Sequence, residues 1–97
     1  MGKHSRNLCH SIMQKMVRNR LITKLTLLPS HDLGTTKYLF FYQKKPFMIK
    51  FYYNELVDQY GSISLENVVT GQTINYHPRM INYVTVSLFR TYLNQLK

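Results

Sequence analysis

The chain has 97 residues, with 13 Lys and Arg against four Asp and Glu, and 44% of its residues are hydrophobic. This length predicts a single domain over residues 1–97, and the hydrophobic content excludes wholesale disorder. No apolar run approaches the ~20 residues that cross a bilayer, and a lone Cys9 excludes an intrachain disulfide and a paired-cysteine redox or zinc motif.

The first twenty residues predict a basic helix, and residues 21–97 predict an α/β core. Apolar residues recur at three-to-four spacing over residues 6–19, as they do on one face of a helix. Residues 21–28 are rich in apolar and β-branched residues and predict a strand, which a loop with Pro and Gly follows. Residues 36–45 fit either a helix face or an aromatic strand, and Pro46 must end a helix there.

Three further strands are expected in the second half of the chain. Residues 46–53 predict a strand that is buried on both faces, and residues 54–61 predict a polar connection with one helical turn. Strands at residues 62–69 and 72–77 flank Thr70-Gly71, which is typical of a hairpin.

A helix is expected to close the chain. Pro78 suits the first turn of a helix, and an apolar stripe at helical spacing runs from there to residue 96. The strand and helix periods predict that the largely buried residues include Leu25, Leu27, Phe47, Ile49, Phe51, Val84, Leu88 and Tyr92.

The net positive charge is confined to the first half of the chain. Residues 1–50 hold one acid, Asp32, and ten basic residues, whereas residues 51–97 are neutral. A one-sided field of this strength favours a polyanionic partner, and nucleic acid is the commonest one. We therefore expect RNA phosphates to contact the ten basic residues Lys3, Arg6, Lys15, Arg18, Arg20, Lys24, Lys37, Lys44, Lys45 and Lys50.

Residues 37–53 hold eight of the thirteen aromatic residues, with lysines threaded among them. Rings that stack bases beside cations that hold phosphates are a common way to bind single-stranded RNA. The alternative is that most of these rings form the core, which we expect for Phe40, Phe41, Phe47 and Phe51. Tyrosines at strand ends are the better candidates for RNA contact, because their hydroxyls need polar partners.

The order of the elements resembles the thioredoxin-like family of mitochondrial ribosomal proteins, which also includes a small accessory subunit of respiratory complex I. In that resemblance residues 21–28 are the first strand, residues 33–41 the first helix and residues 46–53 the second strand. Residues 63–77 then form the hairpin before the final helix. The resemblance implies a small α+β, thioredoxin-like domain with a mixed four-stranded sheet between a basic N-terminal and a C-terminal helix. It implies no catalytic residues.

Candidates for acid–base chemistry are the four histidines His4, His10, His31 and His77. No two of them have metal-ligand spacing, and the carboxylates Glu55, Asp58 and Glu66 are too scattered for a metal or glycosidase site. We therefore predict no enzyme activity, no metal, no cofactor and no small-molecule substrate. A small toxin-like ribonuclease is an alternative, and it requires His31 or His77 close to Arg79 or Arg90.

Together these features predict a structural constituent of a ribosome. Its basic half would bind ribosomal RNA, and its neutral half would contact neighbouring ribosomal proteins. The basic, acid-free start with Ser5 and Ser11 resembles a mitochondrial transit peptide, which predicts the mitochondrial matrix as the location. The first alternative is an accessory subunit of a mitochondrial respiratory complex. A basic amphipathic helix could also lie on an anionic membrane, although no membrane span is expected.

Overall fold

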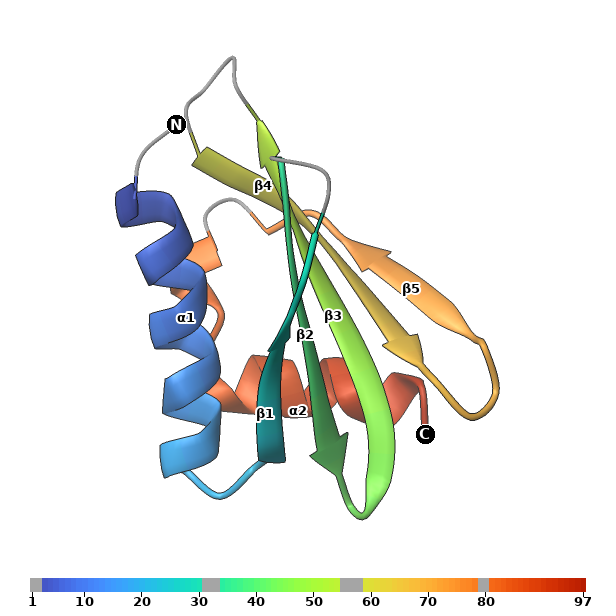
Figure 1. Ribbon diagram of the computed structural model, residues 1–97. Coiled ribbons are helices and arrows are strands. Elements are labelled where there is room, and N and C mark those ends of the chain that lie inside the picture. Colours follow the sequence, from blue (N-terminus) through green and yellow to red (C-terminus); the bar gives the residue numbers. More distant parts are fainter. Residues whose placement is uncertain (1–2, 31–33, 55–58, 79–80) are drawn as a thin grey trace.

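The computed structural model describes residues 3–30, 34–54, 59–78 and 81–97. In these residues the order of elements is α1 (Lys3–Arg18), β1 (Thr23–Leu28), β2 (Thr35–Tyr42), β3 (Lys45–Asn54), β4 (Gln59–Asn67), β5 (Thr73–Tyr76) and α2 (Val86–Gln95), with a 3₁₀ helix at Ile81–Tyr83. The five strands form one antiparallel sheet in sequence order (Figure 1). A small α+β domain with an N-terminal and a C-terminal helix is confirmed, whereas the mixed, four-stranded sheet is wrong.

The main correction concerns the residues expected as the first helix of a thioredoxin-like order. Residues 35–41 of that stretch belong to strand β2, in which Thr36, Tyr38, Phe40 and Tyr42 are buried and the residues between them are half-buried. This alternation is the period of two of a strand. Strands β1 and β2 are neighbours in the sheet and pair antiparallel. The thioredoxin-like arrangement is not confirmed.

The two strands around Thr70-Gly71 are confirmed as a hairpin, because β4 pairs with β5. Gly71 has a φ of 77° in the connecting turn, a conformation that glycine adopts without steric cost. Strand β4 begins at Gln59, inside the stretch expected to be a polar connection. Residues 55–58 of that stretch lie outside the described residues.

The core lies between the two helices and one face of the sheet. Helix α1 contributes Cys9, Ile12, Met13 and Met16, which recur at helical spacing and are all buried. The sheet contributes the rings of Tyr38, Phe40, Phe47 and Phe51, each at 0% exposure. Burial of Phe47, Ile49, Phe51 and Val84 is as expected from the sequence.

Two residues of the expected core are exposed. Leu27 lies on edge strand β1 with 56% of its surface accessible, and Leu88 is 37% exposed. Leu25 and Tyr92 are half-buried against the core. The core prediction is therefore wrong at Leu27 and Leu88.

Leu88 is exposed because α2 begins later than the expected residue 79. Thr85 has an extended conformation, and its hydroxyl accepts a hydrogen bond from the backbone N–H of Leu88 at 3.1 Å. This N-cap starts the helix at Val86. The break between the 3₁₀ helix and α2 shifts the buried stripe of α2 by one residue, to Phe89 and Leu93.

Candidate nucleic-acid interface

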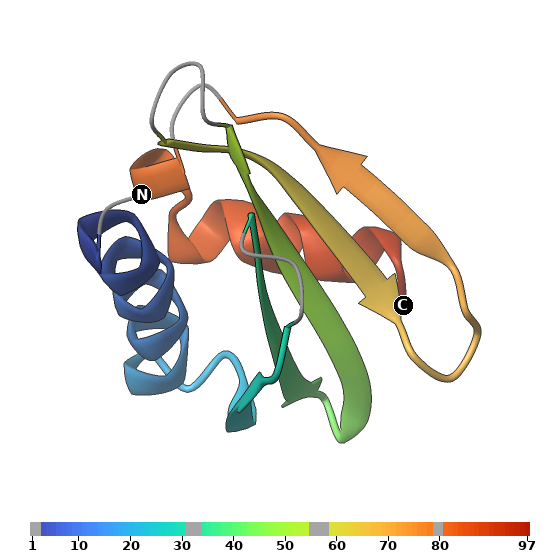
Figure 2. The ribbon, with the colours of Figure 1, turned by 45° about the horizontal axis from the view of Figure 1, so that its top comes forward.

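The sheet has one face covered by helices. His10 of α1 stacks on Tyr38 of β2 with 6.2 Å between ring centroids, and Phe89 of α2 lies 5.8 Å from Phe40 of the same strand. Tyr38 and Phe40 are two residues apart and point to the same side of β2, so both helices cover the same face (Figure 2). We call the opposite face, which neither helix covers, the outer face.

Lys37 of β2 and Lys50 of β3 are direct cross-strand partners on the outer face. Both side chains are half-buried. Directly opposite residues of an antiparallel pair have Cβ atoms about 5 Å apart, so these two positive charges repel each other and destabilise the sheet. A bound anion would relieve this repulsion, which makes the pair a candidate phosphate site.

Aromatic and polar side chains occupy the next row of the outer face. Tyr52, two residues beyond Lys50 on β3, pairs with Ser62 of β4 and is 39% exposed. Ser62 Oγ lies 3.0 Å from Nδ1 of His77, which is also exposed. The two rings therefore belong to the same row, beside the lysine pair. Exposed rings next to cations are suited to stacking bases while phosphates are held.

The row on the other side of the lysine pair is apolar at its centre. Leu39 pairs with Met48, and Met48 pairs with Glu66 of β4. Glu66 is the one acidic residue that the described part of this face carries, and it lies diagonally from Lys50. The outer face therefore keeps an excess of positive charge.

A further cation, Lys24, and a further ring, Phe41, lie near the start of β1 and the end of β2. Phe41 is half-buried on the outer face and not in the core, because it falls between the inward-pointing Phe40 and Tyr42. Lys24 Nζ stands 5.2 Å from the centroid of the Phe41 ring, a cation–π contact. The expectation that Phe41 is a core residue is therefore wrong.

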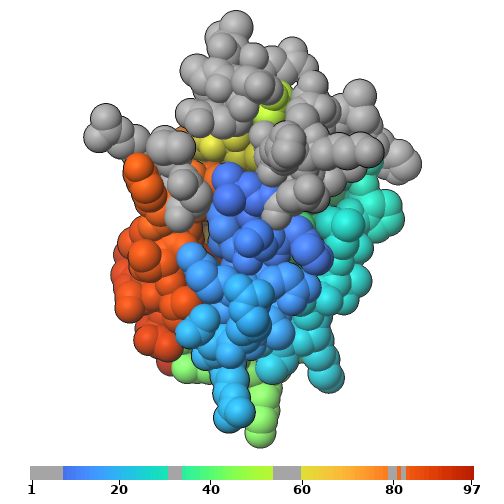
Figure 3. Space-filling view, turned by 90° about the vertical axis from the view of Figure 1, so that its left-hand side faces the viewer, coloured from blue at the N-terminus to red at the C-terminus, as the bar shows by residue number. Residues whose placement is uncertain are grey.

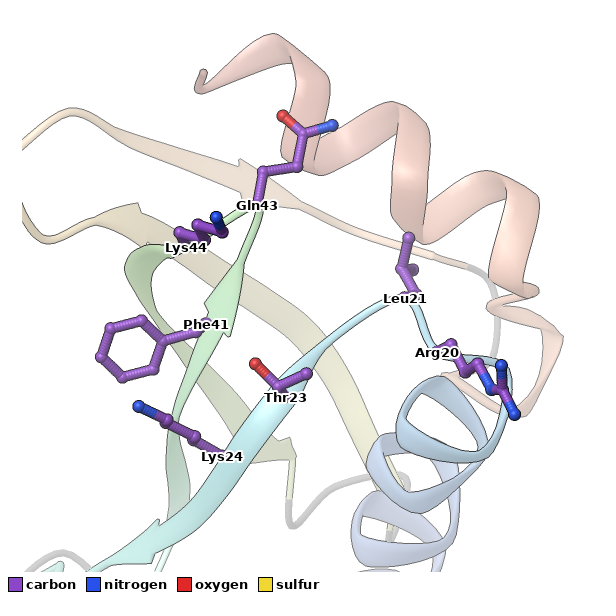
Figure 4. A pocket seen from close by; sticks show the side chains of 7 residues that line it. All are labelled: Arg20, Leu21, Thr23, Lys24, Phe41, Gln43 and Lys44. Carbon is purple, nitrogen blue, oxygen red and sulfur yellow. The ribbon is translucent and has the colours of Figure 1, made fainter.

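Phe41 and Lys24 also line a pocket of about 450 Å³ (Figure 4). The pocket lies between the start of β1 and the turn that joins β2 to β3. Three of its lining residues are cations, and none is acidic. The full lining comprises Arg20, Leu21, Thr23, Lys24, Phe41, Gln43 and Lys44.

The first of these cations ends helix α1 in a left-handed conformation. Arg20 has a φ of 59°. Its N–H donates to Val17 O at 2.9 Å, and the N–H of Leu21 donates to Met16 O at 3.0 Å. This pair of bonds is the Schellman motif, in which glycine usually occupies the left-handed position. An arginine at that position costs about 1–2 kcal/mol relative to an ordinary backbone conformation.

Two other local motifs that line the pocket also contain non-glycine residues with positive φ. Lys24 has a φ of 54° at a bulge in β1, where the register with β2 shifts by one residue. Gln43 and Lys44, with φ of 51° and 67°, form the two-residue turn between Tyr42 and Lys45. Positive φ at both positions is the type I′ turn, which favours asparagine and glycine. All four left-handed, non-glycine residues in the described part of the chain therefore line this one pocket.

The remaining predicted RNA-binding residues are spread over other surfaces. Lys15 Nζ donates to Val84 O at 3.1 Å, so this residue ties α1 to the segment before α2. Arg18 is exposed at the end of α1, whose solvent-facing side lies open between α2 and β1 (Figure 3). Lys45 is exposed and pairs with Tyr42, on the helix-covered side. Lys3 and Arg6 lie in the first turns of α1.

The ten basic residues form one set in the sequence, but the structure joins Lys37 with Lys50 on the outer face and Arg20, Lys24 and Lys44 at the pocket. The alternating burial of β2 is a signal that could have placed Lys37 on the open face. No local signal brings Arg20 and Lys44 to the same pocket.

Of the His–Arg pairs that a ribonuclease site could use, the described residues include His77 with Arg90 alone, and these two do not lie on the same face of the sheet. His77 lies on the outer face beside Ser62, whereas Arg90 lies on α2, which covers the other face. His31 and Arg79 lie outside the described residues. No cluster of His, Cys, Asp or Glu suited to a metal ion occurs among the residues that the structure describes. None of the described helices has the length and apolarity needed to span a membrane.

Comparison of the chain with protein-family models, with curated proteins and with solved structures found no match. The functional proposals below therefore rest on the geometry and the charge of the chain itself.

Proposed function

We propose that this protein binds RNA through the outer face of its sheet. The main support for this proposal is that Lys37 and Lys50 lie directly opposite each other on that face. Two cations that lie directly opposite each other on neighbouring strands lower the stability of the fold, because like charges repel. A phosphodiester that lies between the two ammonium groups converts this repulsion into two charge-assisted contacts.

The rings beside the lysine pair favour single-stranded RNA over a duplex. Tyr52 and His77 lie in one row of the outer face, and Tyr52 is 39% exposed. Bases of a single strand are free to stack on such rings, whereas bases of an A-form duplex are not. The hydroxyl of Ser62 supplies a hydrogen-bonding group in the same row.

We further propose that the RNA is ribosomal and that the protein is a structural constituent of a mitochondrial ribosome. The formal charge of +9 and the clustering of that charge in the first half of the chain support this role. Large apolar side chains exposed in the neutral half support contact with neighbouring ribosomal proteins. They include Val68, Val69, Tyr83 and Leu88. An accessory subunit of a respiratory complex would leave the opposed lysines unexplained.

The test of RNA binding is a salt titration of affinity for a labelled single-stranded RNA, followed by fluorescence anisotropy. Five phosphate contacts, by Arg20, Lys24, Lys37, Lys44 and Lys50, predict a log–log slope of about −3.5, at about 0.7 per contact for single strands. Lys37→Thr with Lys50→Thr should reduce this slope by about 1.4. Arg90→Gln with Lys97→Gln removes the same charge from α2 and the C-terminus and should change the slope little. A salt-independent affinity, or equal losses in both double variants, would refute the proposed interface.

A further inference from the structure

The pocket beside Phe41 is lined by three local motifs that each contain a left-handed residue and that lie far apart in the sequence. A helix end, a strand bulge and a hairpin turn each place a long polar side chain where glycine would be easier to accommodate. Elsewhere the chain does use glycine for this purpose, at Gly71 in the turn between β4 and β5. Strained backbone residues cluster at functional sites, where the strain is retained for the side chain that it presents.

The side chains at these positions share one chemistry. Arg20, Lys24 and Lys44 are cations, and Gln43 carries an amide that can donate hydrogen bonds. In Figure 4 Lys24 and Phe41 extend to the same side of β1 and β2, whereas Arg20 extends from the end of α1 on the other side of Thr23. Arg20 therefore lies apart from the ring, and the three cations do not converge on one point. This spacing suits successive phosphates of a strand better than one isolated anion.

The pocket is also continuous with the outer face. Phe41 lines the pocket and lies on the same strand face as Lys37, two rows away. A strand that crosses the lysine pair can therefore pass over Leu39 and reach the ring of Phe41. The volume of about 450 Å³ is within the range of small-ligand sites.

We propose that the pocket holds one nucleotide at the end of the RNA path over the outer face, an inference that rests on the proposed function. The base stacks on the ring of Phe41. Lys44 binds a phosphate next to this nucleotide, and Arg20, beyond Thr23, binds a phosphate further along the strand. Stacking of a base on an aromatic ring is stronger than an exposed cation–π contact, so Lys24 leaves the ring and also binds a phosphate.

The left-handed conformations allow a test in which RNA affinity falls while the thermal stability of the protein is unchanged or raised. Arg20→Gly with Lys44→Gly removes two proposed phosphate ligands at positions that glycine tolerates best. Its Tm should therefore be unchanged or raised, whereas its affinity for an oligouridylate of about ten nucleotides should fall by about tenfold or more at low salt. Phe41→Leu should also weaken binding by about tenfold, because stacking is lost.

Arg90→Gln with Lys97→Gln is the matched control, since it removes the same charge outside the pocket. If the glycine variant binds the oligonucleotide as tightly as this control while Lys37→Thr with Lys50→Thr binds weakly, the pocket proposal is wrong and the proposed function stands. If the unmodified protein does not bind RNA, the proposed function itself fails. If the glycine variant loses binding to phosphatidylserine vesicles and keeps its RNA affinity, the pocket is a lipid site and the inference is overturned.

Discussion

Lys37 and Lys50 face each other across strands β2 and β3, on the side of the sheet that neither α1 nor α2 covers. The two residues are thirteen positions apart in the chain. Their opposition follows from the register of a hairpin whose turn is Gln43-Lys44. The same turn places Lys44 in the pocket beside Phe41, so one hairpin links both parts of the proposed RNA path.

Replacement of one of these lysines by glutamate should stabilise the fold and weaken RNA binding. Lys37→Glu converts a repulsive cross-strand pair into an attractive one and should raise the free energy of unfolding by about 0.2–1 kcal/mol. The same change places a carboxylate against the phosphates, and RNA affinity should fall by more than tenfold. Urea denaturation and anisotropy measure the two effects. Lys45→Glu makes the same charge change on the helix-covered side and should reduce affinity much less.

The shifted register of α2 predicts a contrast between two neighbouring residues. Phe89 is 1% exposed and contacts Phe40, so Phe89→Ala should reduce the free energy of unfolding by about 3–5 kcal/mol. Leu88→Ala should cost less than about 1 kcal/mol, because this side chain is exposed. Chemical denaturation of both variants measures the difference. A larger loss from Leu88→Ala would show that the buried stripe of α2 has been misplaced.

A buried hydrogen bond between Thr36 and Tyr60 is suited to a double-mutant cycle. Thr36 Oγ1 lies 2.8 Å from the Tyr60 hydroxyl, and both residues are buried. Tyr60→Phe removes one hydroxyl and leaves the other without this partner, which should cost about 1–2 kcal/mol. Thr36→Val combined with Tyr60→Phe should cost less than the sum of the two single changes. Additive losses would mean that the hydroxyls do not interact.

Two stacked tyrosines predict a loss of stability at high pH. The rings of Tyr76 and Tyr92 lie 3.6 Å apart between centroids, and Tyr76 OH donates to Gln95 Oε1. Burial raises the pKa of both hydroxyls, and the charge of Tyr92 adds to the rise at Tyr76. Because the unfolded chain loses these protons first, near its ordinary pKa of about 10, stability is complete below that pH and declines as pH rises through the raised values.

The corresponding experiment compares urea midpoints over alkaline pH for the unmodified protein and for Tyr76→Phe with Tyr92→Phe. The double variant keeps the stack but has no hydroxyls to titrate, so its stability should fall less steeply above about pH 10. Identical slopes for the two proteins would exclude this pair as a source of the alkaline loss.

Local pattern in the sequence was sufficient for most of the individual elements. The apolar spacing of α1, the strands around residues 21–28 and 46–53 and the hairpin at Thr70-Gly71 all appear where they were predicted. These elements are determined locally, because helix and strand periods differ and few residues suit a tight turn. The confinement of net positive charge to the first half is likewise a property of the sequence alone.

Only the tertiary structure decided which way each element faces and which strands are neighbours. Residues 36–42 carry consecutive rings at Phe40, Phe41 and Tyr42, so their period became clear only when helices covered Tyr38 and Phe40 and left Phe41 outside. The stripe of α2 moved by one residue because of the N-cap at Thr85. The opposition of Lys37 and Lys50 depends on strand register, and the presence of Arg20 and Lys44 in one pocket depends on where a helix ends relative to a distant turn. Such contacts arise from the burial of one shared core and have no signature in local sequence.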